Sequence, residues 1–168
     1  MAVKSAGAEV TPEAQLKSLI EKFDPDTQAL IRALRTALRK RFPTANELIY
    51  DYGFSLVLGY SPSEHGIESI VTLSARAEGV NLYFSNGPKL PDPKKLLQGS
   101  AKMVRFISID AASRLKHPDV EALIAAAVKL ASVPMPAKGG GRLIIKTRAA
   151  DKKPRPKNAK RKKEVRKK

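Results

Sequence analysis

Arg105 is the side chain in the central part of the sequence whose setting most suggests chemistry. It alternates with Met103 and Ile107 in a predicted strand, which places its charge on an apolar strand face. An unpaired charge on a buried face is costly. Because buried charges are usually paired, we favour an internal salt bridge from Arg105 to Glu47 or Asp51.

A second interpretation of the same residues is a small anion-binding pocket. Lysine and arginine would supply positive charge, and tyrosine hydroxyls would donate hydrogen bonds. The candidate lining residues are Glu47, Tyr50, Tyr52, Lys89, Lys102 and Arg105.

The residue types that usually perform catalysis or bind metals are few and scattered. Cysteine is absent, and His65 and His117 are the only histidines, so no metal-ligand spacing occurs. No serine lies in a G-x-S-x-G turn, and Gly139–Gly141 lacks the Lys-Ser/Thr of a phosphate-binding loop. We therefore expect no catalytic residue, no metal and no cofactor, and we predict that the protein is not an enzyme.

Positive charge is concentrated at the C-terminal end of the chain. The 168 residues carry a net charge of +16, of which +13 lies from Lys138 onward and only +3 in residues 1–137. The cations of the last segment are Lys152, Lys153, Arg155, Lys157, Lys160, Arg161, Lys162, Lys163, Arg166, Lys167 and Lys168. Such a segment binds nucleic acid by releasing condensed counterions and needs no fold to do so. The alternative is a solubilising extension without a partner.

Two further features bear on that partner. The segment has no aromatic residue for base stacking, so it predicts no preference for single strands. Arg32, Arg35 and Arg39 repeat at helical spacing, which is typical of a solvated helix face but would also extend a phosphate-contacting surface.

The elements that must position these residues can be read from periodicity and capping signals. Thr11-Pro12 and Asp24-Pro25 each predict the start of a helix, and Pro118 opens a third. Between the second and third helices the pattern alternates as in strands, and the strand at 102–109 is apolar on both faces, which favours a central place in the sheet. The predicted strands are 48–52, 54–60, 67–75, 80–85 and 102–109, with one helical turn at 93–97 and either an edge strand or a flexible segment at 142–147.

Composition and length set the domain organisation. The chain is 42% hydrophobic, enough for one packed domain with an appendage. We expect disordered residues at 1–10, a domain at 11–133, a linker at 134–150 and a disordered tail at 151–168, because the tail has almost nothing to bury. Neither a secretory signal nor a membrane span is expected, which predicts a cytoplasmic protein.

Three segments resemble the YdhG-like domain of unknown function, a family of small bacterial proteins. They are Pro43 to Gly53 with Glu47 and Ile49-Tyr50, Leu82-Tyr83-Phe84 followed by Gly87, and Leu90 to Asp110. The resemblance covers roughly residues 23–131. It implies a small antiparallel sheet packed with helices, and some relatives are described as frataxin-like iron chaperones.

Together these observations predict an α+β domain with a basic tail. We expect a non-enzymatic binding module that associates with nucleic acid through the tail, without sequence preference, and so sits on the nucleoid. The alternative is a frataxin-like iron or small-ligand binding chaperone in which the tail is incidental.

Overall fold

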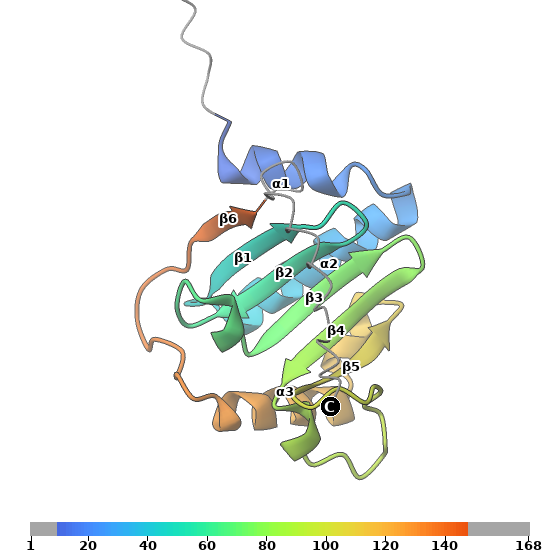
Figure 1. Cartoon of the computed structure of the whole chain (residues 1–168), viewed down its shortest axis with the longest axis vertical. Helices are drawn as coiled ribbons and strands as arrows, with labels where there is room; N and C mark the ends of the chain where they lie inside the picture. Colours follow the sequence, from blue (N-terminus) through green and yellow to red (C-terminus); the bar gives the residue numbers. More distant parts are fainter. Residues whose placement is uncertain (1–9, 148–168) are drawn as a thin grey trace, which may run out of the picture.

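The computed structural model describes residues 10–147 (Figure 1). The predicted tail at 151–168 lies outside the described residues, as do residues 1–9. With η marking short 3-10 helices, the elements are α1 (Pro12–Ile20), α2 (Pro25–Arg41), β1 (Asn46–Asp51), β2 (Leu56–Ser61), η1 (Gly66–Glu68), β3 (Val71–Arg76), β4 (Gly79–Ser85), η2 (Gly87–Lys89), β5 (Val104–Ile109), η3 (Ala112–Lys116), α3 (Pro118–Leu130) and β6 (Leu143–Thr147).

Each helix begins at the residue that its capping signal predicts. The Thr11 hydroxyl accepts a hydrogen bond from the Ala14 amide (3.2 Å), and the Asp24 carboxylate accepts one from the Thr27 amide (3.0 Å). These bonds satisfy amides that have no partner inside the helix. Proline follows both caps and also opens α3, where its fixed φ suits the first turn. No helix in residues 10–147 is both long and apolar enough to cross a bilayer.

The strands form one sheet in the order β5-β4-β3-β2-β1-β6. All neighbours are antiparallel except β1 and β6, which run parallel. The chain reaches β6 only after passing through α3, since a parallel pair cannot be joined by a tight hairpin. The predicted α+β class, with helices packed on a small and mostly antiparallel sheet, is confirmed.

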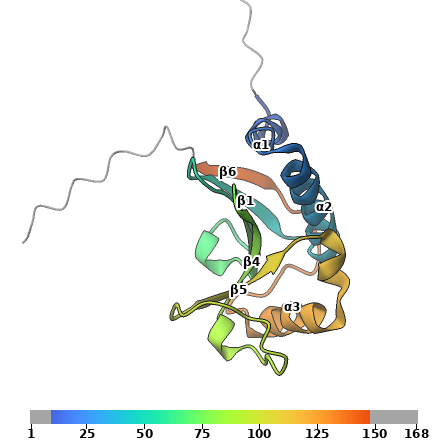
Figure 2. The same cartoon turned by 90° about the vertical axis from the view of Figure 1, so that its right-hand side faces the viewer.

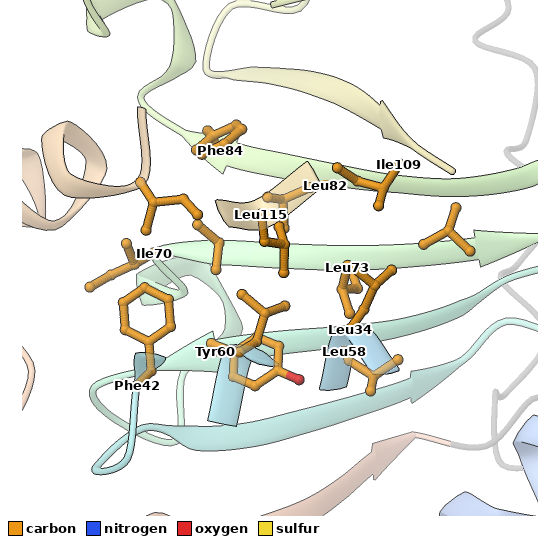
Figure 3. Packing of buried hydrophobic residues seen from close by; sticks show 14 of the residues in the cluster. Leu34, Phe42, Leu58, Tyr60, Ile70, Leu73, Leu82, Phe84, Ile109 and Leu115 are labelled. Atoms are coloured by element: carbon orange, nitrogen blue, oxygen red, sulfur yellow. The ribbon is translucent and has the colours of Figure 1, made fainter. Parts of the chain in front are cut away.

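All three α-helices lie on the same face of the sheet (Figure 2). The core fills the space between them and the sheet, where alternate strand residues such as Leu58, Leu73 and Leu82 meet Leu34 of α2 (Figure 3). These four side chains are at most 1% exposed. Burying a leucine of this kind contributes roughly 1.5–3 kcal/mol, so the core holds the helical layer in place.

Two local predictions were wrong. The strand predicted from residue 67 begins only at Val71, because Gly66–Glu68 forms a 3-10 turn that leads the chain back toward the sheet. The helical turn predicted at 93–97 is an irregular loop. There the Asp92 carboxylate accepts hydrogen bonds from the amides of Leu96 and Leu97, both at 2.8 Å, in place of a helical backbone ladder.

The two edges of the sheet are formed by β5 and β6, and the β5 edge differs from expectation. β5 is an edge strand, not a central one. It is apolar on both faces because the Phe106 ring packs against Tyr83 on the face away from the helices, with ring centroids 5.1 Å apart, and because Gln98 pairs with Phe106 along the edge. At the other edge, the segment at 142–147, for which we left an edge strand and a flexible segment open, contains strand β6 (Leu143–Thr147).

Candidate functional site

The six predicted pocket residues are not brought together. Glu47 lies on β1 and Arg105 on β5, with β4, β3 and β2 between them. Four strand spacings of about 4.8 Å separate the two backbones by about 19 Å. Lys89 in η2 and Lys102 just before β5 are both exposed. The prediction of one pocket lined by all six residues is therefore wrong. No local sequence pattern specified which strands would be neighbours in the sheet.

Arg105 forms neither of the predicted salt bridges. Its half-buried guanidinium donates to the backbone carbonyls of Ala101 and Val104, the latter at 2.8 Å. The predicted acidic partner Asp51 instead lies 3.9 Å from Lys22. Arg105 is the second residue of the edge strand β5, where carbonyl groups of the preceding loop are within reach. Backbone carbonyls therefore accept the hydrogen bonds that we had predicted a carboxylate would accept.

Glu47 is the centre of the best-defined polar site in the described structure. Arg35 on α2 donates to it twice, from Nε to Oε2 (3.0 Å) and from Nη2 to Oε1 (2.9 Å). The same guanidinium also donates two hydrogen bonds to the Glu13 carboxylate of α1, from Nη1 to Oε2 (3.1 Å) and from Nη2 to Oε1 (2.7 Å). Arg39 Nε lies 3.4 Å from Glu47, and the Tyr60 hydroxyl donates to Glu47 Oε2 at 3.1 Å. We call these five residues the Glu47 cluster.

The electrostatics of the Glu47 cluster favour a structural role. Burial alone would lower the pKa of Arg35, but its hydrogen bonds to Glu13 and Glu47 raise it above the ordinary value. The hydrogen bond from Arg35 in turn lowers the pKa of Glu13. Both shifts favour the charged forms of Arg35 and Glu13, so these two groups stay ionised at neutral pH and hold each other. Because Glu13, Arg35 and Glu47 belong to α1, α2 and β1, the cluster ties both helices to the sheet.

The same contacts show what the arginine stripe on α2 does in the folded protein. Arg35 and Arg39 both pair with carboxylates and are largely neutralised. Arg32 is exposed and has no side-chain partner within residues 10–147. A groove of about 700 Å³ between α1 and α2 is lined by these three arginines, yet only Arg32 is free to meet a phosphate there. The stripe is thus mainly part of the folded structure.

Tyr60 makes the stability of the folded state depend on pH in the alkaline range. Burial, reinforced by the charge of Glu47, raises the pKa of the Tyr60 phenol well above its ordinary value near 10. The folded state therefore keeps a proton that the unfolded chain loses. This contribution to stability is complete below about pH 10 and is lost as the pH rises further, by up to about 1.4 kcal/mol per pH unit.

We expect Tyr60→Phe to be about 1 kcal/mol less stable than the wild type at neutral pH, because the hydrogen bond to Glu47 is lost. Above about pH 10 the gap should close and then reverse, since phenylalanine cannot ionise. Urea unfolding of both proteins at several pH values between neutrality and strong alkali measures this difference. A gap that stays constant across the series would contradict the assignment.

Within residues 10–147, no serine hydroxyl is hydrogen-bonded to a histidine ring. His117 caps α3, with Nδ1 accepting from the Asp119 amide at 3.2 Å. Ser61 donates to the backbone carbonyl of His65, not to its imidazole. Over residues 10–147 no three His, Asp or Glu side chains gather into a group that could hold a metal ion.

Sequence reasoning missed a surface on the sheet face that points away from the helices. We call it the open face. Its middle row of register partners runs from Gly59 through Thr72 and Tyr83 to Phe106. The alternation of Val80, Leu82 and Phe84 with Asn81, Tyr83 and Ser85 fits a half-buried strand, but only the strand order shows that Phe106 lies beside Tyr83. The strand residues of the open face include Asn46, Leu48, Tyr50, Val57, Gly59, Ser61, Thr72, Ser74, Arg76, Asn81, Tyr83, Ser85, Val104, Phe106 and Ser108. The 62–69 loop covers part of this face, with hydrogen bonds to Asn46, Ser61 and Ser85.

The predicted nucleic-acid contacts in the tail lie outside the described residues, but their point of attachment does not. β6 ends at Thr147, whose register partner is Tyr50 on the adjacent strand β1. The basic segment therefore continues from the β1 side of the sheet.

Comparison with known proteins assigns no relative. No family model, curated protein or solved structure matches the chain.

Proposed function

We propose that this chain is a non-enzymatic binding protein that associates with nucleic acid through its Lys/Arg-rich tail, without sequence preference. The observation that carries the proposal is the density of charge in residues 151–168, which contain eleven Lys/Arg and two acidic residues. Each phosphate neutralised by such a segment releases condensed counterions, which favours binding to any nucleic acid. A place on the nucleoid follows from this activity, and the sequence resemblance favours assigning the domain to the YdhG-like family.

The ion pairs of the domain are consistent with giving this role to the tail. Arg35, Arg39, Arg41 and Arg142 each lie within salt-bridge distance of a carboxylate. Cations that are already paired gain less from a phosphate than free ones, because the existing partner must be displaced. We therefore expect the tail to supply most of the phosphate contacts.

The test is a salt titration of binding to a DNA duplex of arbitrary sequence. With roughly five to eight tail cations engaged, log K should fall against log salt with a slope of about −4 to −7. A chain truncated after Ala150 should lose nearly all affinity. A full-length chain with its tail Lys/Arg changed to Gln is the matched control, because it removes charge while keeping length, and it should behave like the truncation.

Two outcomes would overturn the proposal. Equal binding by the full chain and the truncated chain would show that the domain, not the tail, contacts nucleic acid. Absence of binding by the full chain at low salt would mean that the tail is only a solvated extension.

A further inference from the structure

Arg114 is a half-buried arginine in η3 whose guanidinium has no partner within residues 10–147. The described chain holds three other half-buried arginines, and each of them is engaged. Arg35 and Arg41 pair with carboxylates, and Arg105 donates to backbone carbonyls. Arg114 Nε is buried, yet no atom of the described chain accepts its proton. A buried donor without an acceptor is rare and destabilising, so packing alone does not explain this side chain.

The Arg114 side chain lines a cavity of about 450 Å³ that opens to solvent at one end of the sheet. The start of α2, the β3–β4 turn and the end of β5 come together there (Figure 1). The volume is within the range of about 300–1,000 Å³ that small-molecule sites have. Of the three guanidinium nitrogens, Nε alone is both buried and unbonded, so the two Nη groups keep accessible surface. They are therefore free to donate hydrogen bonds to a ligand in the cavity.

Two carboxylates line the same cavity. Glu78 is in the β3–β4 turn, and Asp110 directly follows β5. Both side chains are exposed, and neither has an ion-pair or hydrogen-bond partner in the described part of the chain. Arg114 is not within salt-bridge distance of either of them, although all three line one cavity. One positive group and two negative groups are thus present at a single site without neutralising one another.

Neutral side chains complete the lining of this cavity. Thr27 and Leu30 come from the first two turns of α2, and Asn81 is on β4. The half-buried Leu30 offers apolar surface, and the Asn81 amide can both donate and accept hydrogen bonds. The lining therefore suits a small molecule that carries a positive group, a negative group and a short side chain.

We propose that this cavity binds a free α-amino acid, with its carboxylate on the Nη groups of Arg114 and its ammonium held by Glu78 and Asp110. A guanidinium can hold a carboxylate through two parallel hydrogen bonds. A phosphate or another purely anionic ligand suits the site less well, because the two carboxylates would repel it. A purely cationic ligand would leave Arg114 without a partner. This inference goes beyond the proposed function and does not depend on the tail.

The first test uses the unmodified full-length chain and screens each of the common L-amino acids by thermal shift and titration calorimetry. At least one should raise the unfolding temperature and bind with a Kd of about 1 mM or lower. The best binder is then compared with two analogues, one that lacks the amine and one that lacks the carboxylate. Each analogue should bind at least about 10-fold more weakly, because it leaves one charged side of the cavity unpaired.

The second test uses variants in the full-length chain. Arg114→Met should weaken binding of the best amino acid about 10- to 100-fold, because the hydrogen bonds to the ligand carboxylate are lost. Lys116→Met is the matched control, since it removes the same charge from the same 3-10 helix at an exposed side chain outside the cavity, and it should bind as the wild type does. Glu78→Gln combined with Asp110→Asn should remove most of the preference for the amino acid over its analogue without the amine.

A measurement without ligand distinguishes this role from a structural one. Arg114→Met should unfold at the same urea concentration as the wild type or at a higher one, because it removes a buried donor that has no acceptor. Arg105→Met should unfold at a lower urea concentration, since that guanidinium has backbone acceptors. A side chain that weakens the fold while it serves binding is expected at a ligand site.

Three results would overturn the inference. The first is that no L-amino acid binds. The second is that the analogue without the amine binds as tightly as the amino acid and Arg114→Met has no effect, which would indicate general attraction of anions to a basic chain. The third is that Arg114→Met destabilises the free protein as much as Arg105→Met does, which would show that Arg114 has a structural partner in solution. None of these results bears on the proposed function, whose test is salt-dependent binding of duplex DNA.

Discussion

Arg35→Met should destabilise the protein by about 3–5 kcal/mol, the largest loss that we expect from a single side chain. The substitution removes both bidentate contacts of the Glu47 cluster at once. The side chain of Glu47 is only 5% exposed, so its carboxylate would stay buried with Arg39 and Tyr60 as its remaining partners. Breaking one side of a buried ion pair is costly because the remaining charge is left without adequate compensation. Urea unfolding at neutral pH measures the loss.

Two further variants make this prediction specific. Arg35→Met combined with Glu47→Leu should recover most of the lost stability, because a well-packed apolar pair no longer strands a charge. Arg41→Met is the control on the same helix. Its partner Glu121 is 45% exposed, so breaking that pair should cost no more than about 1 kcal/mol. Equal losses in Arg35→Met and Arg41→Met, or a double variant weaker than the single one, would contradict a buried structural cluster.

The helices could be predicted from sequence because their signals are local. Thr11 and Asp24 cap helices whose next residue is proline, and a cap acts within three residues along the chain. The strands after them were located less well. Gly66–Glu68 reads as strand by its apolar Ile67, yet that side chain is 91% exposed on a 3-10 turn. Apolar content alone could not separate the two.

The candidate sites depended on contacts between segments far apart in the sequence. Arg35 and Glu47 were each singled out, but for different sites, because their pairing depends on how α2 and β1 come together in the fold. Arg105 was given a carboxylate partner because it alternates with apolar residues, but it lies on the edge strand β5, where backbone carbonyls accept its hydrogen bonds. The charge of the tail needed no such information, since it follows from composition alone.

Gly141→Ala should detach β6 from the sheet or cost about 3 kcal/mol or more, toward the upper end for an overpacked site. A β-carbon at this position would collide with the backbone carbonyl oxygen of Ala45, just before β1. The strand cannot easily move aside, because the Arg142 carbonyl accepts from the Glu47 amide (2.9 Å) and the Arg142 amide donates to Asn46 (3.0 Å). Hydrogen exchange should show fast exchange of the β6 amides.

Gly140→Ala is the matched control for this prediction. The same methyl group at the neighbouring glycine would meet no atom within 4 Å, so stability and exchange should stay close to the wild type. Unchanged β6 exchange in Gly141→Ala would show that the backbone can absorb the methyl group, and parallel changes in both glycine variants would show that the contact with Ala45 is not the cause.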